Sequence, residues 1–440
     1  MIPKTEEKYI CYDFNNLKFL DSLSFMNPDD SLEKLVESLR NKDEYDLNDI
    51  SKFKHTHKYF KKLYPFMTDE DMKLIITKGI YPYEYTNSHE KFEEKELPPI
   101  GNFYSSLNNT TISQKDYDHA HKVWKTFKMK NLGEYHDFYL RTDVMLLADV
   151  FENFREIDMK TYGLDPAHYI TGCSFSLDAA LRKYGKQIKL FHEGQSDLYL
   201  FTEKGIRGGM SFIAHRHSIA NNPYMKNFDP KKPIIYILYL DANNLYGWAM
   251  IQKLATGGYK WEIINEWNEE RIMSISDDDK RGYIFEVDLE YPKELQDKHN
   301  LYPLCPERKK VLTSWLSNFQ KDLKKKLEIK DDQVEKLVTD LKDKNNYILH
   351  YKNLQLYLKL GMKLKKIHKC LSYDSEAWLK DYIMSNSELR QKAKAENDAF
   401  RANIYKIKNN GVFGKQMENV RNRVDIKLMK DSDERRFWTL

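Results

Sequence analysis

The sequence has few cysteines, glycines and prolines. Its four cysteines, Cys11, Cys173, Cys305 and Cys370, lie far apart and form no C-x-x-C pair, which excludes a disulfide framework and a zinc knuckle. We expect all four to be packing residues. The 17 glycines and 13 prolines among 440 residues are too few for a low-complexity chain, so the composition is that of a globular protein.

Long apolar runs are also missing. No stretch reaches the roughly 18 apolar residues that a membrane span needs. The first residues, "MIPKTEEKYICYDF", lack the apolar core of a secretory signal. We therefore expect an intracellular protein, in the nucleus or the cytoplasm, with no membrane partner.

Positive charge is in small excess. A net charge of +4 on 440 residues identifies no partner, but residues 307–330 and 359–369 are locally rich in lysine and suit a phosphate backbone. The alternative is a solvated helix face. In the first segment five apolar residues recur at helical spacing: Leu312, Trp315, Leu316, Phe319 and Leu323.

The length predicts two or three domains built from both helices and strands. Before residue 100 we expect a short strand in 16–25, a helix in 30–40 and a lysine-rich loop. A longer helix is predicted over 135–163. One face of it combines five residues: Tyr139, Asp143, Leu147, Val150 and Phe154.

Later segments predict strands, an insertion and a further helix. Residues 232–240, "KPIIYILYL", form a continuous apolar run typical of a strand buried on both faces. Residues 282–292 alternate like a neighbouring strand, within a charge-rich stretch, 262–345, that resembles an insertion. Residues 387–420 predict one long helix that stops near 409–411.

Asp241 follows the apolar run and has two interpretations. A carboxylate at a strand end could hold Mg²⁺. Phosphoryl transfer by the two-metal route, however, needs more than one such carboxylate. Alternatively, Asp241 is the N-cap of a helix beginning at Ala242.

Lys406 has two interpretations as well. With Asn410, Gly411 and Gly414 it offers a cation and a close-approaching backbone, which suit a triphosphate and a base pair. A lysine beside glycines is also ordinary at a helix C-terminus.

The order D-x-x-N-L-Y (241–246), then K-x-x-x-N-G-x-F-G (406–414), resembles motifs A and B of family B DNA polymerases. The sequence is most similar to the protein-primed branch of Polinton/Maverick mobile elements, linear plasmids and related viruses. Five segments follow the order of that branch: "DVMLLADVFENFR", "KGIRGGMSFIAHR", "DANNLYGWAM", "YPLCPE" and "NNGVFGKQMENVRNRVDIKL".

The resemblance implies an α+β chain with a partial RNase H-like exonuclease domain, a polymerase palm with an insertion and helical fingers, and no thumb. Its five ranges are the end of a 3′–5′ exonuclease domain (1–160), a glycine loop and first part of the palm (161–261), a palm strand with a terminal-protein-region-like insertion (262–345), the palm edge and fingers (346–420), and the start of a second insertion (421–440).

The resemblance implies roles for individual residues in DNA-directed DNA synthesis. Asp241 becomes the catalytic carboxylate that binds Mg²⁺, and Lys406 neutralises the triphosphate as pyrophosphate leaves. Asn244 and Leu245 carry the backbone near the phosphates. The ring of Tyr246 lies under the sugar, where it excludes a 2′-hydroxyl; the alternative is a core tyrosine.

Further nucleotide and DNA contacts follow from the same resemblance. Lys394 becomes a second phosphate contact, and Asn410, Phe413 and Gly414 line the nascent base pair. The remaining contacts are to DNA strands: Gly208 and Gly209 stand in the family's Y-x-G-G loop, and Ser22 follows a strand that contacts single-stranded DNA.

Several positions depart from the family pattern. Ile206 replaces the tyrosine of the Y-x-G-G loop, which removes a stacking or hydroxyl contact. Asn244 stands for Ser, Gly247 for Pro, Gly411 for Ser and Phe413 for Tyr. We expect these changes to reduce the precision of nucleotide placement without loss of the fold.

The exonuclease is represented by Tyr139 and Asp143, which fit its Y-x-x-x-D motif and lie on one helical face. No D-x-E precedes residue 139, so we expect the chain to begin inside the nuclease domain and not to hydrolyse DNA. Motif C, a D-T-D on an apolar hairpin, is missing too, because Asp431 and Asp433 have charged flanks.

We therefore expect a polymerase fragment, truncated at both ends, with low activity alone. Its substrates and partners would be deoxynucleoside triphosphates, primer–template DNA and a terminal protein primer. The alternatives are a non-catalytic DNA-binding remnant of a mobile-element polymerase and a stand-alone nuclease, for which the D-x-E is lacking.

Overall fold

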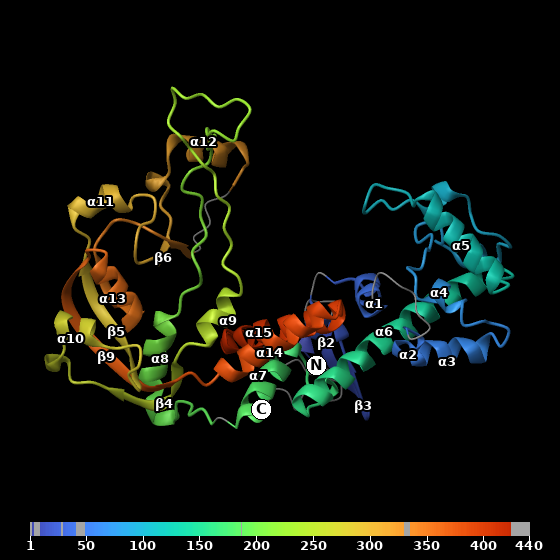
Figure 1. The fold of residues 1–440 in the computed structure, drawn as a ribbon, viewed down its shortest axis with the longest axis horizontal. Helices are drawn as coiled ribbons and strands as arrows, with labels where there is room; N and C mark the ends of the chain where they lie inside the picture. Colours follow the sequence, from blue (N-terminus) through green and yellow to red (C-terminus); the bar gives the residue numbers. More distant parts are fainter. Residues whose placement is uncertain are drawn as a thin grey trace, which may run out of the picture. The chain divides into compact units, whose positions relative to one another are not determined.

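The computed structural model describes residues 2–3, 9–27, 30–40, 49–185, 187–329 and 335–423. It combines α-helices with antiparallel strands, as predicted, and divides into two compact units (Figure 1). Unit 1 comprises residues 1–186 and 379–440, and unit 2 comprises residues 187–378. Each unit has a buried core of its own.

Unit 1 is mainly helical. Its strands form one antiparallel sheet in the order β1-β2-β3: β1 (Ile2–Pro3), β2 (Tyr9–Phe14) and β3 (Leu17–Leu20). Its helices are α1 (Leu32–Arg40), α2 (Asp49–Lys52), α3 (Lys54–Leu63), α4 (Met72–Ile75), α5 (Gln114–Thr126), α6 (Leu132–Tyr162), α7 (Gly172–Tyr184), α14 (Lys380–Ala395) and α15 (Ala399–Gln416). The predicted early strand and helix are β3 and α1, while the lysine-rich stretch is helix α3 and not a loop.

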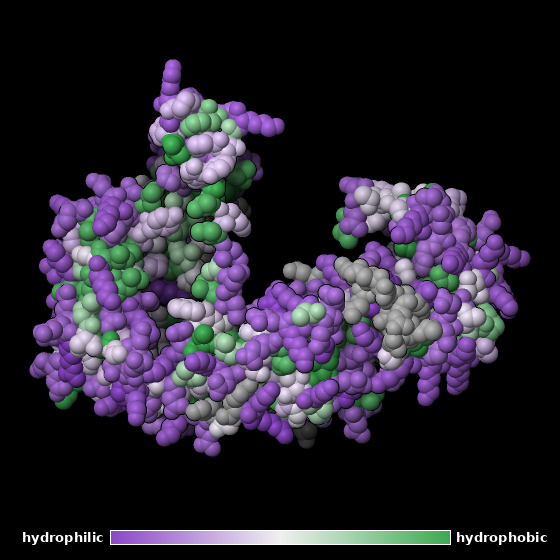
Figure 2. Space-filling model, viewed as in Figure 1, coloured by the Kyte–Doolittle hydropathy of each residue, from purple (hydrophilic) through white to green (hydrophobic). Residues whose placement is uncertain are grey.

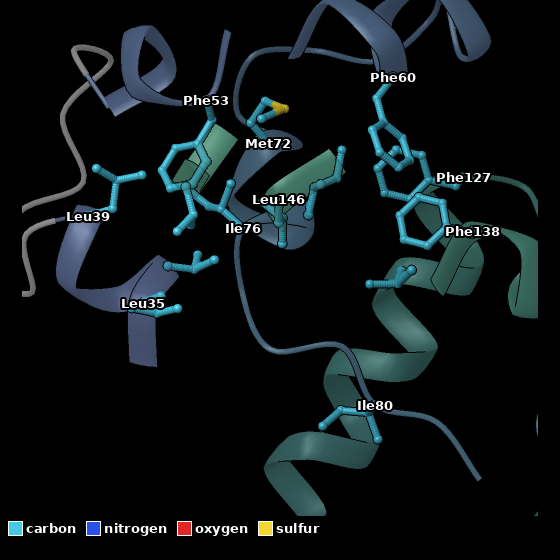
Figure 3. Close-up of a cluster of buried hydrophobic side chains, with 14 of the residues drawn as sticks. Leu35, Leu39, Phe53, Phe60, Met72, Ile76, Ile80, Phe127, Phe138 and Leu146 are labelled. Atoms are coloured by element: carbon cyan, nitrogen blue, oxygen red, sulfur yellow. The ribbon is translucent and has the colours of Figure 1, made fainter. Parts of the chain in front are cut away.

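The long helix α6 organises the core of unit 1 (Figure 3). Asn131 caps its start by accepting a hydrogen bond from the Glu134 amide, and Gly163 ends it with a left-handed φ of 67°. The helix prediction is confirmed, but the predicted face is displaced: Leu147 is 40% exposed, whereas Leu146 is buried.

The long helix predicted over 387–420 is two helices, and that prediction is wrong in two places. The chain turns at 396–398, where Asn397 has a φ of 55° and Asp398 accepts a hydrogen bond from the Arg401 amide to start α15. Helix α15 then continues through 409–411 to Gln416.

Unit 2 contains a four-stranded antiparallel sheet in the order β4-β9-β5-β8 (Figure 1). Its strands are β4 (Leu254–Trp261), β5 (Arg281–Glu290), β8 (Lys344–His350) and β9 (Lys363–Glu376), and β6 (Glu307–Lys310) pairs with β7 (Glu335–Val338). Its helices are α8 (Ser196–Gly205), α9 (Leu245–Met250), α10 (Glu269–Ser274), α11 (Lys293–His299), α12 (Asn318–Lys326) and α13 (Tyr351–Lys359). The strand predicted at 282–292 is confirmed as β5, which lies between β8 and β9.

The two faces of this sheet are covered by different elements. One face packs residues of β5, β8 and β9 against α10 and α13, in a cluster that includes Phe285, Val287 and Leu354. On the other face Ile348 and Leu371 contact Leu198 and Phe201 of α8. The alternation of side chains along the strands accounts for both layers.

The apolar run 232–240 is not a strand buried on both faces, so that prediction is wrong. Its backbone makes a single isolated bridge, between Ile235 and Asn221. Leu238, Tyr239 and Leu240 are 78%, 95% and 85% exposed, and Figure 2 shows apolar side chains at the surface where the chain runs between α9 and the α12 region. A strand is buried on both faces only within a sheet, and the described sheets do not include this run.

The two basic segments do not form the solvated helix face that is the alternative to phosphate contact. Residues 307–329 contain β6, a 3₁₀ turn and α12, and four of the five apolar side chains of the helical pattern are exposed, among them Trp315 by 46% and Phe319 by 62%. Residues 363–369 belong to β9. Both segments therefore present cations, and the first also presents aromatic rings.

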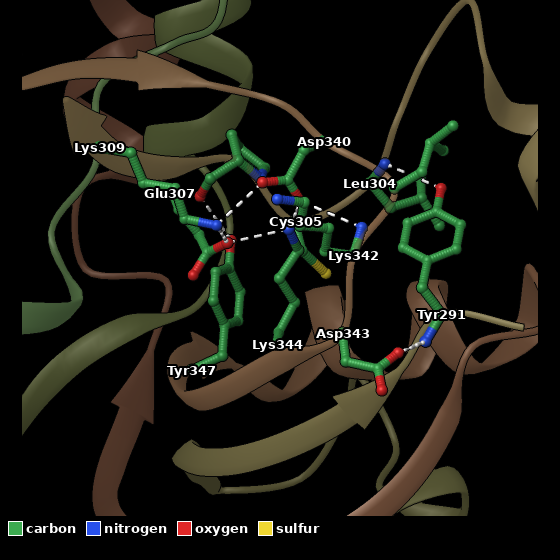
Figure 4. Close-up of polar contacts among 12 residues, drawn as sticks. Tyr291, Leu304, Cys305, Glu307, Lys309, Asp340, Lys342, Asp343, Lys344 and Tyr347 are labelled. Atoms are coloured by element: carbon green, nitrogen blue, oxygen red, sulfur yellow. Dashed lines mark hydrogen bonds and ion pairs between the residues drawn. The ribbon is translucent and has the colours of Figure 1, made fainter. Parts of the chain in front are cut away.

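An ion-pair network holds β6 to the start of β8 (Figure 4). The buried Nζ of Lys344 lies 2.8 Å from Glu307 and 2.5 Å from Asp340, and Lys309 Nζ bridges the same two carboxylates at 2.7 and 2.9 Å. Burial raises the pKa of Asp340, but hydrogen bonds from Lys344 and Lys309 outweigh it and bring that pKa to about 2.

The cysteine prediction agrees with the structure. All four thiols are free; Cys11, Cys305 and Cys370 are buried and Cys173 is half-buried. None of the helices in the described ranges is long and apolar enough to cross a membrane.

Candidate functional site

Helix α15 presents the predicted nucleotide-binding residues on one face. Lys406, Asn410 and Gly414 are exposed at a spacing of four residues, and Phe413 beside them is half-buried. Tyr405, on the other side of the helix, is buried. The helical repeat therefore places a cation, an amide and an open stretch of backbone in one row.

A buried ion pair fixes the rotation of this helix. Lys408 Nζ lies 2.6 Å from Asp158 of α6, and both side chains are 0% exposed. The ammonium also lies 3.8 Å from the ring centroid of Phe175 and 4.3 Å from that of Phe154. Burial lowers the pKa of Lys408 and raises that of Asp158 to about 6. Since this pair holds the back of α15, it keeps Lys406 on the exposed side.

Sequence reasoning missed this pair, although a signal was present. Lys408 follows Lys406 by two residues, about 200° around a helix, so both cannot face solvent when one side is packed. Asp158 lies four residues after Phe154, on the buried face of α6.

Two close contacts complete the packing behind α15. A Cβ at Gly411 would lie 2.6 Å from Ser176 Oγ of α7, so only glycine lets these helices approach this closely. Asn409 accepts a hydrogen bond of 2.9 Å from Asn386 Nδ2 of α14. Glycine and asparagine here serve helix packing, which is why they do not end the helix.

The structure brings two of the predicted phosphate contacts together. Lys394 of α14 and Lys406 of α15 line one cavity of about 420 Å³. Neither lysine has an ion-pair partner among the residues that the structure describes. Their charges are therefore available to an anion in the cavity.

Asp241 lies in unit 2, in an exposed stretch between the apolar run and α9. Helix α9 begins at Leu245 with Asn244 as its N-cap, so the interpretation of Asp241 as the cap of a helix starting at Ala242 is wrong. Tyr246 is 53% exposed and is not a core tyrosine. Leu245 is exposed as well.

Asn244 and Gly247 depend on each other. Asn244 has a left-handed φ of 52°, a conformation that asparagine tolerates well, and its side chain occupies the place that a Cβ at Gly247 would need. Both positions differ from the motif that the sequence resembles, and this contact links the two.

The described residues do not by themselves form a two-metal site. No group of three or more His, Cys, Asp or Glu side chains gathers in the described ranges, and Asp241 stands as a single carboxylate. Asp241 belongs to unit 2 and Lys406 to unit 1. A magnesium ion at Asp241 would need further protein ligands.

Tyr139 and Asp143 line a second cavity, of about 550 Å³, in unit 1. The Tyr139 hydroxyl lies 2.6 Å from the Tyr83 hydroxyl. Burial raises the pKa of both Tyr139 and Asp143, and it lowers the pKa of His119, which lines the same cavity. The four-residue spacing does bring both side chains to one place.

The predicted DNA contacts lie in exposed or half-exposed positions. Gly208 and Gly209 follow α8. A Cβ added at either glycine would meet no atom within 4 Å, so no internal packing requires glycine there. Arg207, which the sequence did not single out, anchors this loop by donating to the Ile348 carbonyl at 2.6 Å. Ser22 starts the 3₁₀ turn after β3 and is half-buried.

Comparisons with known proteins found no matching family model and no matching curated protein. Three solved structures of Phi29 DNA polymerase align with the chain at 15% identity and a TM-score of 0.36. They are an orthorhombic crystal form, a ternary complex with primer-template DNA and incoming nucleotide substrates, and a post-translocation binary complex with primer-template DNA. The alignments cover 77%, 76% and 77% of this chain and 47%, 46% and 46% of those chains. The chain thus spans less than half the length of these polymerases.

Proposed function

We propose that the chain is part of a protein-primed family B DNA polymerase that binds primer–template DNA and adds deoxynucleotides in template order during DNA replication. One observation carries the proposal: Lys394 and Lys406, assigned from sequence motifs, line one cavity, and Asn410 and Gly414 share the exposed face of Lys406. A terminal protein primer and an origin in a mobile element follow from the motif resemblance.

The roles of the chain's own residues follow from charge and exposure. Lys394 and Lys406 would neutralise the phosphates of the incoming nucleotide, because both cations line a cavity and lack partners among the described residues. The half-exposed ring of Tyr246 would exclude a 2′-hydroxyl by contact with the sugar. Mg²⁺ belongs to the proposal as the ion that Asp241 would hold in part, and no catalytic step is derived through it.

Primer extension tests the catalytic half of the proposal. The chain alone should extend a primer near background, because the described residues put one carboxylate at the proposed metal site. A fusion that adds a D-T-D hairpin and a thumb should extend the primer. Asp241→Asn in that fusion should reduce the rate more than about a thousandfold, and an equal rate for both fusions would contradict the role of Asp241.

A second candidate function is DNA binding without catalysis. Exposed Trp315 and Phe319 beside the lysines of α12 favour it, because such rings can stack on bases. In a mobility-shift titration, primer–template DNA should bind at low salt and dissociate as salt rises. Binding that no nucleotide alters would favour this second function, and no binding at low salt would contradict both.

A further inference from the structure

Helix α3 carries positive charge and no negative charge. Its ten residues, "KHTHKYFKKL", include four lysines and two histidines. On a solvated helix face, cations usually have acids one turn away to pair with, as Arg141 has Asp137 on α6. Helix α3 offers its lysines no such acid, so any partner for them comes from another element or from a ligand.

The orientation of α3 is fixed by α6. Asp149, which is fully buried on α6, accepts hydrogen bonds from the backbone amides of His55 and Thr56 at 3.1 and 2.8 Å, and from the Thr56 hydroxyl at 2.6 Å. The carboxylate thus satisfies amides at the start of α3, where the helix dipole also favours a negative charge. One turn later Phe60 packs against Phe138 of α6, with ring centroids 5.2 Å apart (Figure 3). These contacts determine which face of α3 is exposed.

Two of the four lysines lie on that exposed face without a partner. Lys58 lies two residues beyond Thr56, about 200° around the helix, and Lys62 follows one turn later. Both are exposed, and neither has an ion pair or a hydrogen bond among the residues that the structure describes. The other two are engaged: Lys54 pairs with a carboxylate of α6 at 2.6 Å, and Lys61 donates to a backbone carbonyl.

Aromatic rings are exposed on the same stretch of chain. Tyr59, three residues before Lys62 on the helix, is 36% exposed, and Phe66, just after the helix, is 47% exposed. Lys128, from the segment after α5, places its Nζ 4.3 Å from the ring centroid of Phe66 and has no ion-pair partner in the described ranges. Five residues thus form what is named the α3 patch: Lys58, Tyr59, Lys62, Phe66 and Lys128.

We propose that the α3 patch binds single-stranded DNA: its three lysines contact phosphates and its two rings stack on bases. Unpaired cations beside exposed rings are the features with which proteins bind single strands of any sequence. Lys58 and Lys62 stand one helical turn apart, which lets them contact successive phosphates. None of the patch residues lines the two cavities described above. The inference goes beyond the proposed function, because binding here needs neither a nucleotide nor a pairing template.

Fluorescence anisotropy of the full chain with a labelled oligothymidylate, measured from low to high salt, tests the proposal. The double variant Lys58→Gln with Lys62→Gln should bind about tenfold more weakly at low salt. The slope of log affinity against log salt should become shallower by about 1.4, because two phosphate contacts to a single strand are lost. Phe66→Leu should weaken binding about fivefold or more without changing the slope, since it removes a stacking ring and no charge.

Lys160→Gln with Lys392→Gln is the matched control. It removes the same two charges from exposed positions of α6 and α14, in the same unit and outside the patch. Affinity should stay within about twofold of the unchanged protein, because distant surface charges are screened by salt. Circular dichroism of each variant checks that the fold is kept.

Three results would overturn the proposal. The first is equal weakening in the two double variants, which would reduce the effect to net charge, or no binding of oligothymidylate by the unchanged protein. The second is an equal loss for a blunt DNA duplex of the same length, which would assign the patch to a duplex backbone. The third is an equal loss for phosphatidylserine vesicles, which would assign it to an anionic membrane surface, another partner of basic helices.

Discussion

Helix α15 and the segment that ends at Asp241 contrast in how the protein holds them. Behind α15 lie a buried ion pair, a close glycine contact and an asparagine hydrogen bond. Residues 234–240 before Asp241 are exposed apolar residues with a single isolated bridge. The proposed phosphate-binding residues on α15 are therefore held by the packed core of unit 1. Asp241, the proposed metal-binding carboxylate, has no comparable packing among the described residues. Changes behind α15 should be costly, and changes at Asp241 should not.

Breaking the ion pair behind α15 should have the largest effect. Asp158→Asn leaves the buried ammonium of Lys408 without its counter-charge, and the free energy of unfolding should fall by about 3–5 kcal/mol. Urea unfolding, with hydrogen exchange of the α15 amides as a local measurement, gives the value.

The double change Asp158→Leu with Lys408→Met is the control for that experiment. It replaces both charges by apolar groups and should recover most of the loss. A loss below about 1 kcal/mol in Asp158→Asn would show that the pair does not hold the helix.

Gly411→Ala should have the next largest effect. The new Cβ would overlap Ser176 Oγ at the contact between α7 and α15, and overpacking of this kind costs up to about 3 kcal/mol. Gly414→Ala is the matched control on the same helix: its Cβ would meet only Cys173 Sγ at 3.4 Å, so the gain in helix propensity should dominate. Thermal unfolding compares the two; equal effects would argue against the close contact.

Within unit 2, Asp340 differs from Asp241 because its carboxylate is held by ion pairs, so its contribution to stability should depend on pH. Its pKa is lowered in the folded protein from 3.8 to about 2, so its contribution of about 2 kcal/mol is present above pH 4 and is lost as pH falls through 2. In urea unfolding, Asp340→Asn should be less stable than the unchanged protein at pH 7, and the difference should shrink toward pH 2. A difference independent of pH would contradict the ion pairs with Lys344 and Lys309.

Asp241→Asn should have the smallest effect on stability. The side chain is exposed and caps no helix, so the free energy of unfolding should change by less than about 0.5 kcal/mol. Urea unfolding beside Asp158→Asn makes the comparison direct. A loss of 2 kcal/mol or more, on the order of a buried group, would mean that Asp241 has a structural partner.

Periodicity and motif order predicted the parts of the fold that depend on local signals. The helix around Tyr139, the strand at 282–292 and the helical surroundings of Lys406 followed from them. The face of α6 and the course of α15 did not, because Leu146, Lys408 and Gly411 take their places from helices distant in sequence. The apolar run 232–240 failed for a related reason: strand formation needs a neighbouring strand, and a run of apolar residues does not specify one.

For the candidate site, motif order predicted which residues lie together. It did not predict the other residues that surround them. Lys394 and Lys406 line one cavity, as shared phosphate contacts should. Lys34 of α1, which lines the same cavity, was not identified because the cavity joins α1 to α14 and α15 across more than 350 residues, and spacing carries no signal at that range. Arg390 lies four residues before Lys394 on the same helix, so its spacing did carry a signal.

The most direct test of the proposed function is whether the chain reads a template when it binds a nucleotide. With a primer ended by a dideoxynucleotide, so that no addition can occur, the dissociation of the protein–DNA complex is followed in the presence of each deoxynucleoside triphosphate with Mg²⁺. The complementary nucleotide should slow dissociation by about tenfold or more relative to the other three, equivalent to about 1.4 kcal/mol, and Lys406→Gln should abolish the difference. Equal dissociation with all four nucleotides would contradict a template-directed polymerase.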